Sequence, residues 1–206
     1  MSISILGTTV TREHVVALVQ FVPFLWAFWI YNRKAINRES APSRATWALW
    51  GFMSTLNAIS YTSLSGDLVK AILGIVDASA CVGTFFVVLR YQGTMKLTQS
   101  EKIALGIGLA AIVAWYIFRR ALYASAILQV AVFVSFVPVL IHTWKEPARE
   151  PKMPWFLWTV VYISNFVLVI ARHGSWKDML YPINYIILHG AVWMLTLRQP
   201  KQEVEQ

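Results

Sequence analysis

The chain has 206 residues and a net charge of +8, with 57% apolar and only 14% charged residues. Its mean hydropathy of +0.55 excludes an ordinary water-soluble domain, because such domains carry far more charge. An apolar helix of about 20 residues crosses a bilayer and satisfies its own backbone hydrogen bonds. The composition therefore predicts an all-α integral membrane protein, with residues 1–206 forming a single membrane domain.

Seven apolar runs, each bounded by charged or turn-forming residues, predict seven transmembrane helices. They cover residues 14–31, 44–64, 69–89, 102–118, 121–143, 154–171 and 179–197. The first run has no small-residue cleavage site, which favours a retained helix over a signal peptide. Only Arg119 and Arg120 separate the fourth run from the fifth, so we expect either a very tight turn or one long kinked helix there.

The basic residues predict the orientation of these helices. One side of the predicted bundle carries twelve of the 18 Lys and Arg residues, namely Arg33, Lys34, Arg38, Arg44, Arg90, Lys96, Lys102, Lys145, Arg149, Lys152, Arg198 and Lys201. The positive-inside rule makes that side cytoplasmic. We therefore expect the N-terminus outside and the C-terminus in the cytoplasm, most simply in a plasma membrane. The basic loops explain the net charge, so a nucleic-acid partner is not expected.

Short motifs recur in the two halves of the sequence and indicate an internal repeat. Phe21-Val22-Pro23, followed by Trp29, recurs 115 residues later as Phe136-Val137-Pro138, followed by Trp144. Trp47-x-Leu49-Trp50, followed by Asn57, recurs 108 residues later as Trp155-x-Leu157-Trp158, followed by Asn165. A weaker match, which aligns Gly83 with Gly190, places Asp77 opposite Asn184. Duplication of this kind is common among membrane transporters.

The repeat predicts a plan of three helices, one helix and three helices. The first repeat covers about 14–90, a connector helix covers about 102–118, and the second repeat covers about 121–198. An odd connector gives both three-helix units the same orientation, so we expect two parallel repeats with a pocket between them.

This plan resembles the PQ-loop superfamily, which contains the SWEET sugar transporters. The resemblance rests on the arrangement of the helices, on Pro23 and Pro138 in the first helix of each half, and on the expected topology. The paired W-x-x-W motifs are similar to the motif of PnuC vitamin transporters. The glutamine of the PQ signature is replaced by Phe24 and Val139. The resemblance implies a transporter that works by alternating access.

The repeated tryptophans and asparagines are the first candidate binding residues. Trp29, Trp47, Trp144 and Trp155 lie near predicted membrane ends, where interfacial anchoring is the favoured interpretation. Trp50 and Trp158 lie one turn deeper and are candidates for stacking on a flat or ring-shaped solute. Asn57 and Asn165 follow two turns further along. They either face the solute or hydrogen-bond a neighbouring helix, and the sequence does not separate these roles.

Asp77 and Asn184 are further candidate binding residues, and Pro23 and Pro138 are candidate hinges. A carboxylate inside a membrane helix is costly, so Asp77 is expected to be protonated, partnered or facing water. We favour a hydrogen-bonding role over a proton-carrying one. His189 is a candidate partner, although a buried histidine is more often simply hydrogen-bonded. Each proline removes one helical hydrogen bond, which gives either a plain kink or a hinge.

The sequence favours a transporter over an enzyme. It contains no metal-binding, nucleophile or phosphate-loop motif, and its single cysteine, Cys81, excludes an intrachain disulfide. No metal or cofactor is expected. We expect a transporter or facilitator of a polar, neutral, ring-containing solute such as a sugar or a nucleoside-like vitamin. The expected partners are the lipid bilayer and this solute. The sequence leaves open whether the chain also forms a homo-oligomer. The alternative is a non-transporting seven-helix sensor or receptor, or a structural subunit of a membrane complex.

Overall fold

The computed structural model describes residues 3–5, 8–91, 96–118 and 120–198. A short hairpin of antiparallel strands, β1 (Ile3–Ile5) and β2 (Thr8–Val10), precedes the helices. The helices of the described ranges are α1 (Arg12–Val19), α2 (Phe21–Ile36), α3 (Arg44–Ser65), α4 (Leu68–Tyr91), α5 (Gln99–Phe118), α6 (Ala121–Lys145), the 3₁₀ turn η1 (Pro147–Arg149), α7 (Lys152–Ala171) and α8 (Trp176–Thr196).

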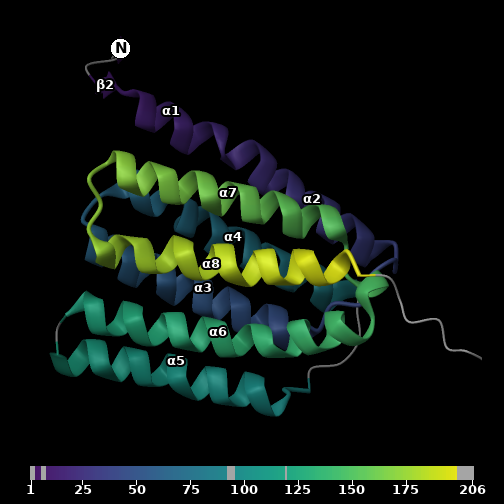
Figure 1. The fold of residues 1–206 in the computed structure, drawn as a ribbon. Coiled ribbons are helices and arrows are strands. Elements are labelled where there is room, and N and C mark those ends of the chain that lie inside the picture. Colours follow the sequence, from purple (N-terminus) through teal and green to yellow (C-terminus); the bar gives the residue numbers. More distant parts are fainter. Residues whose placement is uncertain (1–2, 6–7, 92–95, 119, 199–206) are drawn as a thin grey trace, which may run out of the picture.

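All seven predicted runs coincide with helices, and six of them are long and apolar enough to cross a membrane. These six are α1 and α2 taken together, which lie end to end in Figure 1, and α4, α5, α6, α7 and α8. Large apolar side chains remain exposed on all six: Val22, Phe86, Val113, Phe133, Val167 and Ile187. Apolar surface of this extent fits lipid rather than water. The fold is therefore that of a multi-pass, helical membrane protein.

The helix α3 is as long as the six candidate membrane spans but less apolar. Its 22 residues correspond to about 33 Å of helix. Its buried face carries Ser54, Asn57 and Ser60, which lower its apolar character. This helix ends at Gly66, whose left-handed backbone (φ 60°) caps α3 and allows the tight turn into α4.

The boundary between the fourth and fifth runs is a tight turn. α5 ends at Phe118, α6 begins at Ala121, and Arg120 is extended, whereas Arg119 lies outside the described residues. The two helices lie side by side in Figure 1 and pack closely. The alternative of one long kinked helix is therefore wrong.

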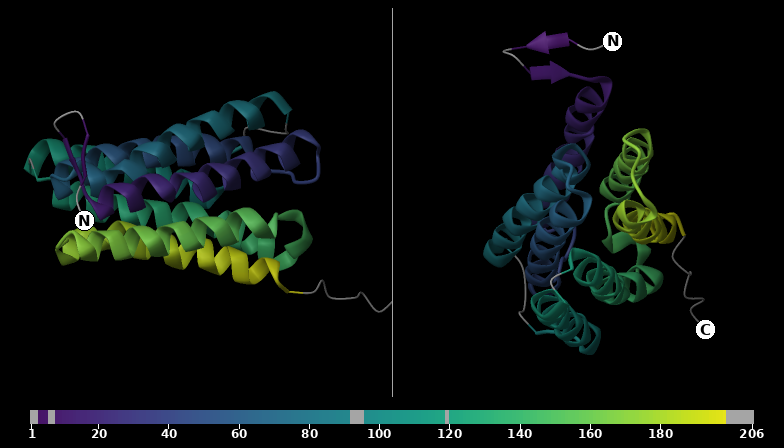
Figure 2. Two further views of the ribbon diagram at one scale, coloured as in Figure 1. Left: turned by 90° about the horizontal axis from the view of Figure 1, so that it is seen from above. Right: turned by 90° about the vertical axis from the view of Figure 1, so that its left-hand side faces the viewer.

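The helices form two groups of three with the same internal order. α4 lies between α2 and α3, and α8 lies between α6 and α7. Across the groups, α2 packs on α7 and α3 packs on α6, while α5 packs on α6 and touches α3. The end-on view in Figure 2 shows α2, α3 and α4 on one side and α6, α7 and α8 on the other. The interior where the groups meet contains most of the buried aromatic side chains.

The bundle has two ends, which are named here by the chain termini near them. The N-terminal end carries the β-hairpin and the connections α3–α4, α5–α6 and α7–α8. The C-terminal end carries the connections α2–α3 and α6–α7 and the last residues of α8 (Figure 1).

Candidate functional site

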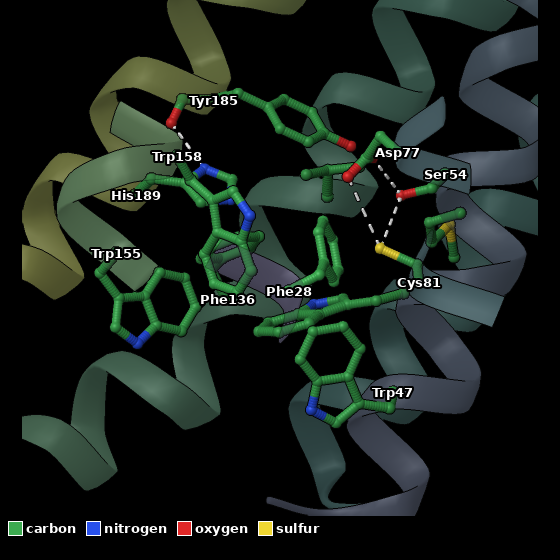
Figure 3. A pocket seen from close by; sticks show the side chains of 13 residues that line it. Phe28, Trp47, Ser54, Asp77, Cys81, Phe136, Trp155, Trp158, Tyr185 and His189 are labelled. Atoms are coloured by element: carbon green, nitrogen blue, oxygen red, sulfur yellow. Dashed lines mark hydrogen bonds between the residues drawn. The ribbon is translucent and has the colours of Figure 1, made fainter. Parts of the chain in front are cut away.

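A small pocket lies in the interior where the two groups of helices meet. Its volume is about 30 Å³, which holds a water molecule or two. We call it the central pocket (Figure 3); it is lined by Phe28, Trp47, Trp50, Met53, Ser54, Asp77, Cys81, Val132, Phe136, Trp155, Trp158, Tyr185 and His189. These side chains come from α2, α3 and α4 on one side and from α6, α7 and α8 on the other.

Two matched sets of aromatic rings form the wall of the central pocket. Trp47 and Trp50 meet at 5.0 Å and 79°, and Trp155 and Trp158 meet at 5.1 Å and 80°. Each deeper tryptophan contacts a phenylalanine of the other group: Trp50 stacks on Phe136 and Trp158 lies against Phe28, both at 4.8 Å between ring centroids. The rings therefore hold the two groups together through a matched pattern of contacts.

Of the four tryptophans expected to anchor the protein at the membrane surface, two are exposed and two are buried. Trp29 and Trp144 are more than half exposed, and an arginine guanidinium lies over each ring. Trp47 and Trp155 are buried, with 2% and 1% exposure. Hydropathy placed all four near membrane ends but does not show which face of a helix turns inward.

Asp77 is the acidic side chain of the central pocket. It is 4% exposed and accepts hydrogen bonds from Ser54 Oγ at 2.8 Å and from Cys81 Sγ at 3.6 Å (Figure 3). Both donors are neutral, and the described residues that line the pocket include no Lys or Arg. The carboxyl group is thus hydrogen-bonded but has no counter-ion in the lining.

His189 is hydrogen-bonded along its own helix. Its Nδ1 lies 2.8 Å from the backbone oxygen of Tyr185. Because a carbonyl oxygen only accepts, Nδ1 carries the proton, and a neutral ring then has Nε2 as an acceptor. This contact supports the interpretation that His189 is simply a hydrogen-bonded histidine and not the partner of Asp77.

The two deeper tryptophans differ in their indole N–H groups. Trp50 donates to Ser135 Oγ at 3.1 Å. Trp158 is 2% exposed and its Nε1 has no hydrogen-bond partner. A buried donor without a partner costs about 1–3 kcal/mol, so this N–H is open to an acceptor from a bound molecule.

The predicted asparagines lie outside the lining of the central pocket. Asn57 accepts from Gln129 Nε2 at 2.8 Å, and Asn184 donates to Gln129 Oε1 at 3.0 Å. This chain links α3, α6 and α8, which fits the role of joining helices. Asn165 is fully buried and neither of its amide atoms has a partner. In α8, Tyr185 and not Asn184 reaches the pocket.

A second cavity, which we call the vestibule, adjoins the central pocket at the C-terminal end. It has a volume of about 230 Å³ and shares Trp47 and Trp50 with the pocket. It is lined by Tyr31, Ala41, Pro42, Ser43, Thr46, Trp47, Trp50, Thr98, Pro138, Val139, His142 and Glu150. The two shared indoles separate the two spaces.

Glu150 is the carboxyl group of the vestibule. It precedes α7, is 8% exposed and accepts from Trp155 Nε1 at 3.0 Å. Burial raises the pKa of Glu150 to about 7, although the hydrogen bond from Trp155 opposes the shift. This carboxyl group therefore changes its charge near neutral pH.

The N-terminal end is closed by contacts between the two groups of helices. Lys70 of α4 and Asp178 of α8 form a salt bridge of 3.2 Å with both side chains 8% exposed. Tyr61 donates to the backbone oxygen of Asp178 at 2.8 Å. Among the described residues, no ion pair joins the two groups of helices at the C-terminal end.

A second ion pair lies beside the first. Asp67 and Arg172 meet at 2.6 Å between the α3–α4 and α7–α8 connections. Burial alone would raise the pKa of Asp67, but the Arg172 guanidinium and backbone amides hold that pKa below its ordinary value. Asp67 is therefore charged at neutral pH.

The candidate hinge prolines occupy different positions in their helices. Pro23 is the third residue of α2, directly after the break that separates α1 from α2. Pro138 lies inside α6 and lines the vestibule. Pro182, inside α8, was not singled out from the sequence.

Several lining residues were missed by sequence reasoning. Ser54 and Cys81 belong to no repeated motif, although Cys81 lies one helical turn from Asp77. Phe28 and Phe136 are separated by the 108-residue offset of the tryptophan motifs, and so are Asp77 and Tyr185. Extending that offset to every helix is the signal that could have found them.

Comparisons with models of protein families, with curated proteins and with solved structures found no match. Among the described residues there is no group of three or more His, Cys, Asp and Glu side chains placed to hold a metal ion.

Proposed function

We propose that the protein is a transporter or facilitator that moves a small, ring-containing solute across a membrane by alternating access. In this proposal Trp50, Asp77 and Trp158 bind the solute in the central pocket. The observation that carries the proposal is the arrangement of the cavities. An aromatic pocket between two groups of helices is closed by ion pairs at one end and adjoins a vestibule at the other.

The matched contacts support the proposal that the two groups are parallel repeats joined by α5. Exchanging α2 with α6, α3 with α7 and α4 with α8 reproduces the observed packing partners. The same exchange relates the ring pairs Phe28–Trp158 and Phe136–Trp50 at an offset of 108 residues. Lys70 and Asp178 are related by that offset too.

The offset of 108 has a consequence for the first helix of each half. It pairs Phe28 with Phe136, whereas the Phe-Val-Pro motifs pair Pro23 with Pro138 at 115. The two alignments differ by seven residues, or about two helical turns, so they bring the same helical faces together. The ring contacts favour 108, and the prolines are then unequal hinges.

We further propose that α3 is a seventh span, with the N-terminus outside and the C-terminus in the cytoplasm of a plasma membrane. The length of α3 supports the first point. The uneven distribution of Lys and Arg over the two sides of the bundle supports the orientation. In this orientation the vestibule opens toward the cytoplasm. The plan supports a relationship with the PQ-loop, SWEET and PnuC group.

Uptake into vesicles tests the proposal. Purified protein reconstituted into proteoliposomes is expected to accelerate entry of labelled ring-containing solutes over protein-free vesicles. Trp50→Ala is expected to reduce that rate about tenfold, because a stacked aromatic contact is lost. Trp29→Ala, which changes an exposed tryptophan, serves as the matched control. Solute binding without any uptake would replace the transporter with a sensor.

A further inference from the structure

The connector helix α5 lies at the edge of the bundle, where it packs on α6 and touches α3 (Figure 1). Thr46 of α3 donates a hydrogen bond to the fully buried Glu101 of α5, which lies 55 residues further along the chain. Leu56 and Ala111 line one small cavity together and are separated by the same number of residues (111 − 56 = 55). The two helices therefore run parallel, and residues that differ by 55 lie side by side.

Gly108 lies on the face of α5 that meets α3, because the same offset places it beside Met53 (108 − 53 = 55). A Cβ atom added at Gly108 would lie 2.8 Å from Met53 Sδ and closer still to Met53 Cε. Non-bonded heavy atoms pack best at about 3.5–4.0 Å, so no larger residue fits here while Met53 keeps its place. Gly108 therefore gives the end of the Met53 side chain a place to lie against α5.

Met53 also borders the central pocket, so its side chain lies between α5 and the candidate binding site. Met53 is buried and is one of the residues that line the pocket, whereas Gly108 is not. The carboxylate of Glu101 holds the start of α5 in place, because besides Thr46 it accepts from the backbone N–H and the hydroxyl group of Thr98, both at 2.7 Å. A methionine side chain is unbranched and flexible, and it moves more easily than a helix held in this way. The space that a displaced Met53 can enter is the central pocket, which has a volume of only about 30 Å³.

We infer that Gly108 sets the size of the central pocket, and thereby of the solute that the pocket admits, because it keeps the end of Met53 out of that space. Gly108 acts through Met53 and is a positioning residue. The connector α5 then forms an outer wall of the site in addition to joining the two groups of helices. The inference concerns the size of the site, and its consequence for the solute rests on the proposed function.

The position of Met53 is the first test, and it needs no solute. The methyl groups of the methionines are labelled with ¹³C in detergent-solubilised protein, and Met53→Leu assigns the resonance of Met53. Gly108→Ala is expected to add nuclear Overhauser contacts between this methyl group and the aromatic protons of the pocket wall. Gly106→Ala is the matched control, because the Cβ position of this glycine in the same helix has open space around it. Both variants are expected to fold, since alanine is a better helix former than glycine. A Met53 methyl group that gains no such contacts in Gly108→Ala would overturn the inference.

Uptake into proteoliposomes is the second test, with labelled D-ribose, D-glucose and uridine as ring-containing probes of increasing size. Gly108→Ala is expected to lower uptake of the largest transported probe about tenfold more than that of the smallest, which is the effect of one extra methylene group in a filled pocket. Adding Met53→Ala to Gly108→Ala is expected to restore the larger probe, because the displaced side chain is then gone. Gly106→Ala is expected to behave like the wild type.

The two tests separate the inference from the proposed function. Equal loss of all transported probes in Gly108→Ala, or no recovery in the double variant, would overturn the inference and leave transport standing. Absence of uptake by the wild-type protein would count against the proposed function alone, since the position of Met53 decides the inference without a solute.

Discussion

Glu150 is a single residue at the end of the bundle whose charge depends on pH and which contacts the aromatic interior. Its carboxyl group is buried in the vestibule lining and holds the indole N–H of Trp155, whose ring lies in the pocket wall. The pKa of Glu150 rises from 4.5 to about 7 because burial disfavours its charged form. The folded chain therefore keeps a proton that the unfolded chain releases as pH rises from about 4.5.

This difference predicts that the contribution of Glu150 to stability falls as pH rises. Between about pH 4.5 and 7 the folded chain binds more protons than the unfolded chain, so the free energy of unfolding decreases, by roughly 2–3 kcal/mol in all. Glu150→Gln keeps an acceptor for Trp155 and removes the titration. Its melting temperature in detergent is expected to fall less between pH 5 and 8 than that of the wild type. The control is the exposed Glu146→Gln, and identical pH curves for wild type and Glu150→Gln would refute the assignment.

At the scale of helices, α4 and α8 meet through residues in equivalent positions of the two groups. Lys70 is near the start of α4, and Asp178 is near the start of α8, where it accepts from the Ser175 N–H as part of a helix cap. Removing one member of a buried pair leaves the other charge uncompensated, at a cost of about 3–5 kcal/mol. Asp178 therefore serves both the ion pair and the end of its helix.

Exchange of the two charges is expected to restore part of the lost stability. Lys70→Met is expected to lower the melting temperature strongly, whereas Lys34→Met, in an exposed ion pair, is worth about 1 kcal/mol or less. The double variant Lys70→Asp with Asp178→Lys is expected to recover some of the loss, but not all, because lysine cannot accept the Ser175 N–H. Thermal unfolding of the singles and the double measures this. Additive losses in the double variant would show that the two side chains do not interact.

Helix positions were predictable from the sequence, whereas the contents of the site were predictable only in part. Long apolar runs fix the spans because the bilayer demands them, and even the tight break after Phe118 was foreseen. Trp50 and Trp158 were predicted because they belong to a repeated motif. Asp77 was predicted because a carboxylate inside a membrane helix is energetically costly. Asn184 was misplaced because a one-residue error in aligning α4 with α8 rotates a helix by about 100°. The buried tryptophans at 47 and 155 show that hydropathy gives depth but not the direction of a face.

At the scale of the whole molecule, the ends of the bundle are unequal. Ion pairs between the two groups close the N-terminal end, and the vestibule lies at the C-terminal end. If the groups rock against each other around the central pocket, opening the N-terminal end must separate Asp67 from Arg172 and Lys70 from Asp178. The free energy of these pairs is then part of the balance between the two states.

A cross-link across the closed end is therefore expected to stop transport. Asp67→Cys with Arg172→Cys, joined by a short thiol-specific linker that a reductant cleaves, is expected to lower uptake into intact cells at least tenfold. Each single cysteine variant is the control, and Cys81 is too buried to react. A membrane-impermeant reductant added outside is expected to restore uptake, because this end faces the exterior in the proposed orientation. Recovery only with a reductant inside the cell would reverse the orientation. Undiminished uptake by fully cross-linked protein would show that the solute does not pass between Asp67 and Arg172, and the two groups would then not move apart at that end.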